Sequence, residues 1–254
     1  MIKHRKDQIR ALLLSIQTGD PAPISVVNQK KYIQHNPQTH EGSEGLEALF
    51  KRLSKTSPRV NIVRAFEDGD FVFAHTEYDF ANSNIGFEVF RFEDDRVVEH
   101  WDNIQRRQGP NQSGHTMVDG PTEVTDHTLT EANRQFVRAF VDDVLVCRQF
   151  EKLESYIDET HFTQHNPQVV DGLSALRSAL EARSGAGHVI KYDRIHRVLA
   201  EGNFVLAVSE GSQDGVHSSF YDLFRVDGAK LVEHWDTIEA IPPRSLWKND
   251  NGKF

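Results

Sequence analysis

Apolar residues recur at helical spacing in the second half of the chain and at strand spacing further on. From 131 to 150 they form one stripe: Phe136, Val137, Phe140, Val141, Val144 and Leu145. This three- and four-residue spacing predicts an amphipathic helix. Shorter helices are expected at 151–157 and 172–183, with an extended segment at 164–168 because the residue before a proline avoids the α conformation. Strands are predicted at 188–199, 204–211 and 218–237, the last folding into a hairpin about Gly228-Ala229.

The first half of the chain repeats this order of elements. Helices are expected at 9–16 and 45–54, and strands at 60–66, 71–80 and 86–104, the last turning at Asp94-Asp95. Helices followed by antiparallel strands are typical of an α+β domain. A curved antiparallel sheet packed on helices leaves a cavity between the layers, and such cavities are common ligand sites.

Two short motifs occur in both halves. Gln34-His35-Asn36-Pro37-Gln38 recurs unchanged at 164–168, and Glu99-His100-Trp101-Asp102 recurs at 233–236. The repeat length is about 130 residues, a whole domain rather than a solenoid unit. The turn-rich stretch 106–126 reads as a linker. The sequence therefore predicts two tandem domains, 1–118 and 119–254.

Composition narrows the class of protein. Apolar residues make up 38% of the chain and charged residues 26%, with a formal net charge of −9. The acidic balance and the absence of a basic stripe argue against a nucleic-acid partner. The short apolar runs argue against a membrane partner, and the charged N-terminus lacks the pattern of a secretion signal, so a cytoplasmic location is expected. Cys147, the single cysteine, is predicted to be a buried apolar residue.

The motifs and the order of elements resemble the SnoaL-like branch of the nuclear transport factor two-like superfamily. Within it, the chain is similar to predicted SnoaL-like polyketide cyclases and aldol-condensation enzymes. The resemblance rests on 32–37, 90–91 and 98–105, and on 164–167, 221–225 and 232–238. It implies two cone-shaped domains, each a curved sheet packed on N-terminal helices. It also implies an intramolecular pseudo-dimer through the sheets, with a homo-oligomer as a further option.

The last strand of each copy carries the first candidate site. Side chains alternate along a strand, so His100 and Asp102 share one face and Glu99 and Trp101 the other. A histidine and an aspartate on one face of a cavity can transfer protons as acid and base. The alternative is a structural hydrogen-bonded pair. In copy two the same roles fall to His234 and Asp236.

The opposite strand face is a second option for the pocket wall. If the hairpin closes at Asp94-Asp95 without irregularity, Glu88 pairs opposite Trp101 and both share a face. We therefore include Glu88, Trp101 and their counterparts Asp222 and Trp235 among the candidate pocket residues, with packing at an interface between sheets as the alternative role of Trp101. A β-bulge would reverse this assignment of faces.

Three further histidines are candidates. His35 and its counterpart His165 follow the extended segment, and the resemblance implies that this segment forms part of the cavity wall. Each would complete a polar site with the histidine and aspartate of the last strand, or else satisfy backbone groups of the turn. His75 has Val208 as its counterpart, so a pocket residue there would make the two copies chemically different.

The sequence offers little support for a metal or a cofactor. Three histidines and an aspartate would suit zinc in copy one, but no His-x-x-x-His or Cys-x-x-Cys spacing is present. No phosphate loop or dinucleotide fingerprint occurs, so neither cofactor nor metal is predicted.

Three functional hypotheses remain. The first is a lyase or isomerase of the cyclase or aldol type that moves protons on a small carbonyl-containing substrate. The second is a non-catalytic ligand-binding or scaffold protein. The third is a division of labour between the copies. The apolar residues Leu246 and Trp247 near the C-terminus are expected to dock on a domain surface, or to form a lid over a cavity.

Overall fold

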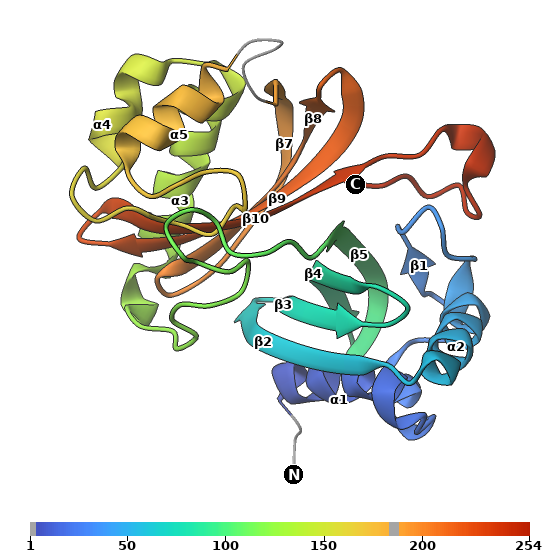
Figure 1. Ribbon diagram of the computed structural model, residues 1–254. Coiled ribbons are helices and arrows are strands. Elements are labelled where there is room, and N and C mark those ends of the chain that lie inside the picture. The colour runs from blue at the N-terminus through green and yellow to red at the C-terminus, as the bar shows by residue number, and fades with distance from the viewer. Residues whose placement is uncertain (1–3, 183–187) are drawn as a thin grey trace. The chain divides into compact units, whose positions relative to one another are not determined.

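The computed structural model describes residues 4–182 and 188–254 and divides the chain into two compact units (Figure 1). Unit 1 contains Met1–Arg106 and Ile241–Phe254, and unit 2 contains Arg107–Ala240. Residues 107–118 thus belong to the second unit, and the C-terminal segment belongs to the first. The expected domains, 1–118 and 119–254, instead place 107–118 in the first domain and the C-terminal segment in the second. They stay a prediction of where one repeat ends and the next begins.

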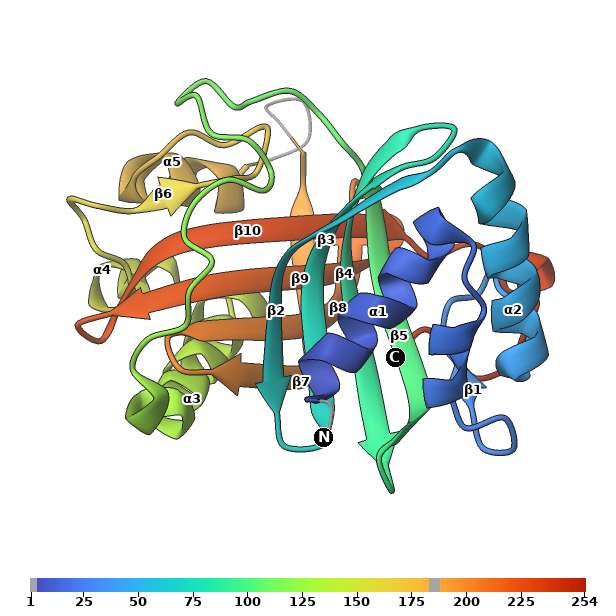
Figure 2. The same ribbon diagram turned by 90° about the horizontal axis from the view of Figure 1, so that it is seen from below.

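Unit 1 is a five-stranded sheet with helices on one face (Figure 2). The strand order is β1-β5-β4-β3-β2, with β1 parallel to β5 and the other neighbours antiparallel. In chain order the elements are α1 (Arg5–Thr18), η1 (Ala22–Val26), β1 (Ile33–Gln34), α2 (Gly42–Leu53), η2 (Ser54–Thr56), β2 (Arg59–Asp68), β3 (Phe71–Asp79), β4 (Ser83–Glu93) and β5 (Arg96–Arg106).

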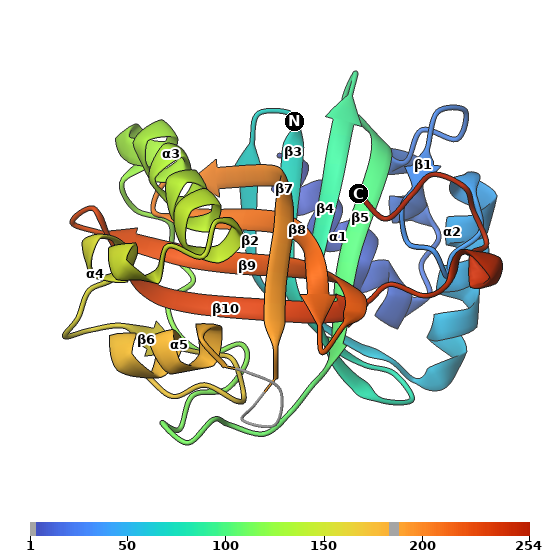
Figure 3. The same ribbon diagram turned by 90° about the horizontal axis from the view of Figure 1, so that it is seen from above.

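Unit 2 repeats this topology with the strand order β6-β10-β9-β8-β7 (Figure 3). Its elements are η3 (His127–Leu129), α3 (Thr130–Phe140), η4 (Val141–Val146), η5 (Phe150–Lys152), α4 (Leu153–Tyr156), β6 (Thr163–Gln164), α5 (Leu173–Leu180), β7 (Ile190–Glu201), β8 (Phe204–Gln213), β9 (Val216–Asp227) and β10 (Lys230–Ala240). A single turn, η6 (Arg244–Leu246), lies in the C-terminal segment of unit 1.

The predicted α+β class is confirmed, and each copy forms a sheet of five strands because a short parallel strand, β1 or β6, joins the four expected ones. The helix expected at 131–150 ends earlier, because its last turn, η4, is a π-helix that closes at Val146. Cys147 follows it and is exposed, so its predicted burial is wrong. Arg148 turns the chain away with a φ of 57°. The helix expected at 172–183 spans Leu173–Leu180, and its expected last residue lies outside the described part of the chain.

Each unit has its own apolar core between helices and sheet. In unit 1, Ile9 and Leu12 of α1 pack with Phe92 and Val97. In unit 2, Val137, Phe140 and Val144 of α3 and η4 pack with apolar residues of β9 and β10. Each such side chain contributes about 1.5–3 kcal/mol when fully buried, so these layers hold the helices against the sheet.

One β-bulge occurs at the same place in both copies and decides which residues face the helices. Between β4 and β5, Val98 is skipped in the pairing, and between β9 and β10, Val232 is skipped. An extra residue in one strand reverses the faces beyond it. Glu88 therefore lies opposite Asp102, and the expected pairing of Glu88 with Trp101 is wrong.

The C-terminal segment contacts unit 1 through polar residues. The expected docking through Leu246 is wrong, since this side chain is 65% exposed. Trp247 is half-buried, and its Nε1 donates to the Pro242 carbonyl within the same segment. Within residues 4–182 and 188–254, no helix is long and apolar enough to cross a membrane.

Candidate functional site

A cavity of about 200 Å³ lies in unit 1 between the sheet, α1 and α2. Glu88, His100 and Asp102 line it from the sheet, and Asn36 lines it from the segment after β1. His100 and Asp102 thus share the face of the sheet that borders the cavity. The remaining wall is largely apolar, formed by Leu13, Ile16, Leu46, Leu49, Phe50, Leu53, Phe80, Phe90 and Ile104.

A chain of buried polar groups runs along this wall. Tyr78 donates its hydroxyl hydrogen to Glu88 Oε1 at 2.6 Å, and Glu88 Oε2 lies 2.7 Å from His100 Nε2. His100 Nδ1 lies 3.0 Å from Gln34 Oε1, which also accepts from the Asn36 backbone N–H. Because that oxygen can only accept, His100 Nδ1 carries a hydrogen, and Nε2 shares one proton with the Glu88 carboxyl.

Asp102 is oriented by one hydrogen bond and one charge. Asn36 Nδ2 donates to Asp102 Oδ2 at 2.6 Å. Lys253 Nζ lies 3.5 Å from Asp102 Oδ1, and both side chains are buried. Oδ1 is within ion-pair distance of the ammonium group but accepts no hydrogen bond. Asp102 is therefore a buried carboxyl group at the cavity wall with one oxygen still able to accept.

Unit 2 holds the same arrangement in a smaller space. Asn166 Nδ2 donates to Asp236 Oδ2 at 2.7 Å, and His234 lies between Gln164 Oε1 and Asp222 Oδ1, 3.0 Å from each. These residues line a void of only about 50 Å³. That void has room for no more than a few water molecules.

Burial changes the acidity of groups in both sites. Burial raises the pKa of Tyr78 and Tyr192 well above the ordinary value, and a neighbouring carboxylate adds to the effect. Burial also raises the pKa of Asp236, with the Asp222 charge adding to it and the His234 charge opposing it. For His234, burial opposes protonation, but the hydrogen bond to Asp222 and the nearby acidic charges outweigh it, so its pKa is raised.

His35 and His165 lie on the other face of the sheet, so their expected place beside the cavity is wrong. The His35 ring stacks on Trp101 with centroids 4.7 Å apart, and its Nε2 lies 3.0 Å from Glu99 Oε1. His165 stacks on Trp235 at 4.6 Å and contacts Glu233 in the same way. The reason is the parallel pairing of β1 with β5, which brings Gln34 beside His100 and leaves the next residue on the opposite face.

The expected pocket roles of His75, Trp101 and Trp235 are not supported by their positions. His75 is buried on the face away from the cavity, stacks on Phe87 at 4.3 Å and contacts Arg64. None of the three lines either cavity. His75 is therefore not the source of a difference between the pockets.

The sequence argument missed several residues of the site. Gln34 and Asn36 lie inside the repeated motif, but neither is among the predicted site residues. In each unit a tyrosine donates to the buried carboxyl, but the two tyrosines lie on strands that do not correspond: Tyr78 on β3 and Tyr192 on β7. No repeated motif marks either tyrosine. Lys253 lies 151 positions from Asp102 along the chain, beyond the range of any local pattern.

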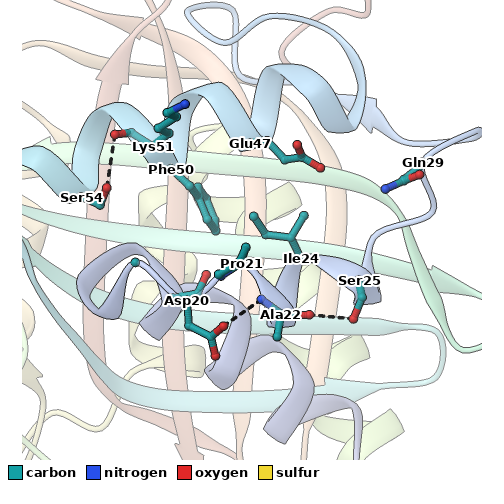
Figure 4. Close-up of a pocket in the computed structure, with 12 residues that line it drawn as sticks. Asp20, Pro21, Ala22, Ile24, Ser25, Gln29, Glu47, Phe50, Lys51 and Ser54 are labelled. Carbon is teal, nitrogen blue, oxygen red and sulfur yellow. Dashed lines mark hydrogen bonds between the residues drawn. The ribbon is translucent and has the colours of Figure 1, made fainter.

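A second hollow of unit 1, about 560 Å³, lies between η1 and α2 (Figure 4). Asp20 accepts from the Ala22 backbone N–H, and the hydroxyls of Ser25 and Ser54 donate to backbone carbonyls within their own turns. The polar groups here serve local turns, so this hollow lacks the buried acid and base of the first cavity.

Both sites bring together groups that could hold a metal ion. Ligand atoms of Glu88, His100 and Asp102 lie within 4.8 Å of one another, and so do those of their counterparts in unit 2. In unit 1 the Lys253 ammonium group beside Asp102 would repel a cation. The Glu88, His100 and Asp102 side chains of unit 1 therefore suit proton transfer better than they suit a metal ion.

The architecture defines a class of protein: α+β domains with a polar site at the base of a cavity between a curved sheet and helices. Residues 9–100 match the family model of the SnoaL-like domain. The resemblance to SnoaL-like domains inferred from the motifs is therefore confirmed for this part of unit 1.

Solved structures resemble part of the chain at low identity. TsrD from Streptomyces laurentii is 20% identical, covering 41% of this chain and 92% of its own, with a TM-score of 0.35. IdmH, a candidate polyketide cyclase from Streptomyces antibioticus, is 16% identical, covering 41% and 93%, with a TM-score of 0.36. A candidate ketosteroid isomerase from Kribbella flavida is 18% identical, covering 45% and 84%, with a TM-score of 0.38. No curated protein matches the chain.

Proposed function

We propose that unit 1 is a lyase or isomerase domain that moves a proton on a small carbonyl-containing substrate, with Asp102 as the base. The observation that carries this proposal is the buried Asp102 carboxyl at the cavity wall. Asn36 orients one of its oxygens, and the other accepts no hydrogen bond. A carboxylate in such a setting can remove a proton from carbon next to a carbonyl.

The surrounding residues support this assignment. The cavity of about 200 Å³ suits a molecule of a few carbon atoms, and its apolar wall would exclude water from the reacting carbon. The hydrogen-bonded Tyr78, Glu88 and His100 line the sheet side of the cavity beside Asp102. In unit 2, the void of about 50 Å³ leaves too little space for a substrate. We therefore assign His234 and Asp236 a structural role, which corresponds to a division of labour between the copies.

The test is deuterium exchange into acetone, cyclopentanone and cyclohexanone, followed by proton NMR. We expect the protein to accelerate exchange next to the carbonyl in at least one of them. Asp102→Asn should lower that rate about 100-fold or more, the usual contribution of a general base. Asp236→Asn and the exposed control Asp227→Asn should retain it. Equal losses in Asp102→Asn and Asp236→Asn would reject the division of labour.

Two alternatives have distinct outcomes in the same experiment. A non-catalytic ligand-binding domain would bind a ketone, seen as shifted NMR signals, without exchange in any variant. A metal-dependent site would lose exchange in a chelator and regain it with zinc. The predicted pairing of the two sheets as a pseudo-dimer, and any homo-oligomer, stay predictions.

A further inference from the structure

A third motif is repeated in the chain, and each copy of it clasps a Gln-His-Asn-Pro segment. Asn111-Gln112-Ser113-Gly114 recurs as Asn249-Asp250-Asn251-Gly252. In both, the asparagine Oδ1 accepts from the backbone N–H two residues on, and the glycine has a positive φ, 92° and 87°. The two segments therefore form the same turn.

The C-terminal turn binds backbone groups of unit 1 that lie next to the cavity. Asn249 Nδ2 donates to the carbonyls of Asn36 and Thr39, at 2.7 and 2.9 Å. Asn251 Nδ2 donates to the Gln34 carbonyl at 2.9 Å. These carbonyls belong to the segment whose Asn36 side chain holds Asp102. The turn thus fixes the residue that orients the proposed base.

His35 completes this clasp from the other face of the sheet. Its Nδ1 lies 3.0 Å from the Gly252 carbonyl, which can only accept, so Nδ1 carries a hydrogen. Its Nε2 contacts Glu99, whose other oxygen accepts from Arg91 Nε at 2.7 Å. In unit 2, His165 contacts the Thr116 carbonyl at 2.8 Å in the same manner. The repeated histidine therefore holds a trailing segment in both units.

The residue after the repeated glycine distinguishes the two clasps. In unit 1 it is Lys253, 3% exposed, with Nζ at 3.5 Å from Asp102. In unit 2 it is His115, which contacts Asp171 at 3.1 Å and Asp119 at 3.6 Å. The residue at this position therefore contacts the cavity aspartate in unit 1, whereas in unit 2 it contacts other acidic residues.

We propose that the C-terminal tail, residues 241–254, is a built-in part of the unit 1 site and that Lys253 is a positioning residue for Asp102. The other groups around Asp102 are Asn36, Glu88, His100 and Tyr32. Lys253 places an ammonium group on the Oδ1 side of the carboxylate and Asn36 places its amide on the Oδ2 side, so the two residues together fix the orientation of Asp102. The role as positioning residue rests on the proposed function, whereas the clasp itself does not.

The clasp is tested without any activity, by acylating lysines of the whole protein with an N-hydroxysuccinimide ester and following each site by mass spectrometry. Lys253 should react at least about tenfold more slowly than the exposed Lys248 in the same molecule. Asn249→Ala and Asn251→Ala should each speed the Lys253 reaction about tenfold, while the matched unit 2 variant Asn111→Ala should not. Equal rates at Lys253 and Lys248 in the unaltered protein would overturn the clasp.

The positioning role is tested by the pH dependence of ketone exchange. Lys253→Met should move the acid limb of the rate profile to higher pH, since the carboxylate loses its cationic partner. Lys253→Arg should restore it, and the exposed control Lys55→Met should match the unaltered protein. A uniform loss of rate with no change in the profile would overturn the role of Lys253. If no variant exchanges any ketone, the proposed function fails, and with it the role of Lys253, while the acylation rates still decide on the clasp.

Discussion

The two cavities share one polar frame but differ in space and in charge. In each, an asparagine holds an aspartate, and a histidine lies between a glutamine and a second acid. Unit 1 has about 200 Å³ and a lysine beside its aspartate, whereas unit 2 has about 50 Å³. In unit 2, burial raises the pKa of Asp236. The same polar residues also hold the first short strand, β1 or β6, against the last strand of each sheet. Their presence in both units is therefore explained by folding alone and is not evidence that both units catalyse a reaction.

The largest expected effect comes from filling the cavity of unit 1. Leu49 on α2 lines it, and the repeated Gly-Leu-x-Ala-Leu pattern makes Leu176 on α5 its counterpart. Leu49→Trp should occupy the substrate space and lower ketone exchange about 100-fold, on the scale of losing the general base. Because the cavity has room for the ring, we expect little change in thermal stability.

The same change in unit 2 should have the opposite pair of effects. Leu176→Trp has no void to fill, so overpacking should destabilise the protein by about 1–3 kcal/mol in urea unfolding. Ketone exchange should be unchanged. The exposed variant Ala48→Trp serves as the control on α2. If Leu176→Trp stopped exchange and Leu49→Trp did not, unit 2 would hold the substrate.

Features of the fold that depend on residues close together in the sequence could be predicted, and features that depend on distant residues could not. The helices, the strands and the turns at Asp94-Asp95 and Gly228-Ala229 follow from local periodicity and turn chemistry. Alternation along the last strand correctly places His100 and Asp102 on one face. The bulges at Val98 and Val232 could not be predicted, because a valine is equally suited to a regular strand.

The rest of the site depends on contacts between distant parts of the chain. The 213 positions between Asn249 and Asn36 leave no periodic signal. A signal was nevertheless present in the repeated Asn-x-x-Gly turn. The apolar character of Leu246 instead predicts docking of a side chain that is exposed in the structure.

A smaller effect is expected in the pH dependence of unit 2. The pKa of Asp236 is raised above 3.8 and that of His234 above 6.5, so the folded unit binds more protons than the unfolded chain. Its stability should therefore fall as the pH rises, first through the raised aspartate value and then through the raised histidine value. Each unit of raised pKa corresponds to about 1.4 kcal/mol.

Asp236→Asn removes the aspartate contribution and the charge that helps to raise the pKa of His234. The fall in stability between pH 4 and pH 8 should shrink, as measured by amide hydrogen exchange of β9 and β10 corrected for intrinsic rates. The exposed control Asp227→Asn should keep the full fall. An unchanged fall in Asp236→Asn would mean that other groups of unit 2 set its pH dependence.

The smallest expected effect concerns one hydroxyl group that only unit 1 has. Gln34 Nε2 donates to the Tyr32 hydroxyl at 3.2 Å, and the counterpart of Tyr32 in unit 2 is Phe162. Phe162 lines the small void together with Gln164. Phe162→Tyr should place a hydroxyl in that void, where it can accept from Gln164 Nε2 as the Tyr32 hydroxyl accepts from Gln34.

We expect Phe162→Tyr to stabilise unit 2 by about 0.5–1 kcal/mol, the net value of one buried hydrogen bond, in urea unfolding. The reverse change, Tyr32→Phe, should destabilise unit 1 by about 1–3 kcal/mol, because it leaves the Gln34 amide buried without its acceptor. Removing the hydroxyl costs more than adding one gains, because a buried donor without a partner keeps its full desolvation penalty. If Phe162→Tyr instead destabilised the protein, the void of unit 2 would be too tight for one oxygen atom, and the difference in space between the two cavities would be greater than their volumes indicate.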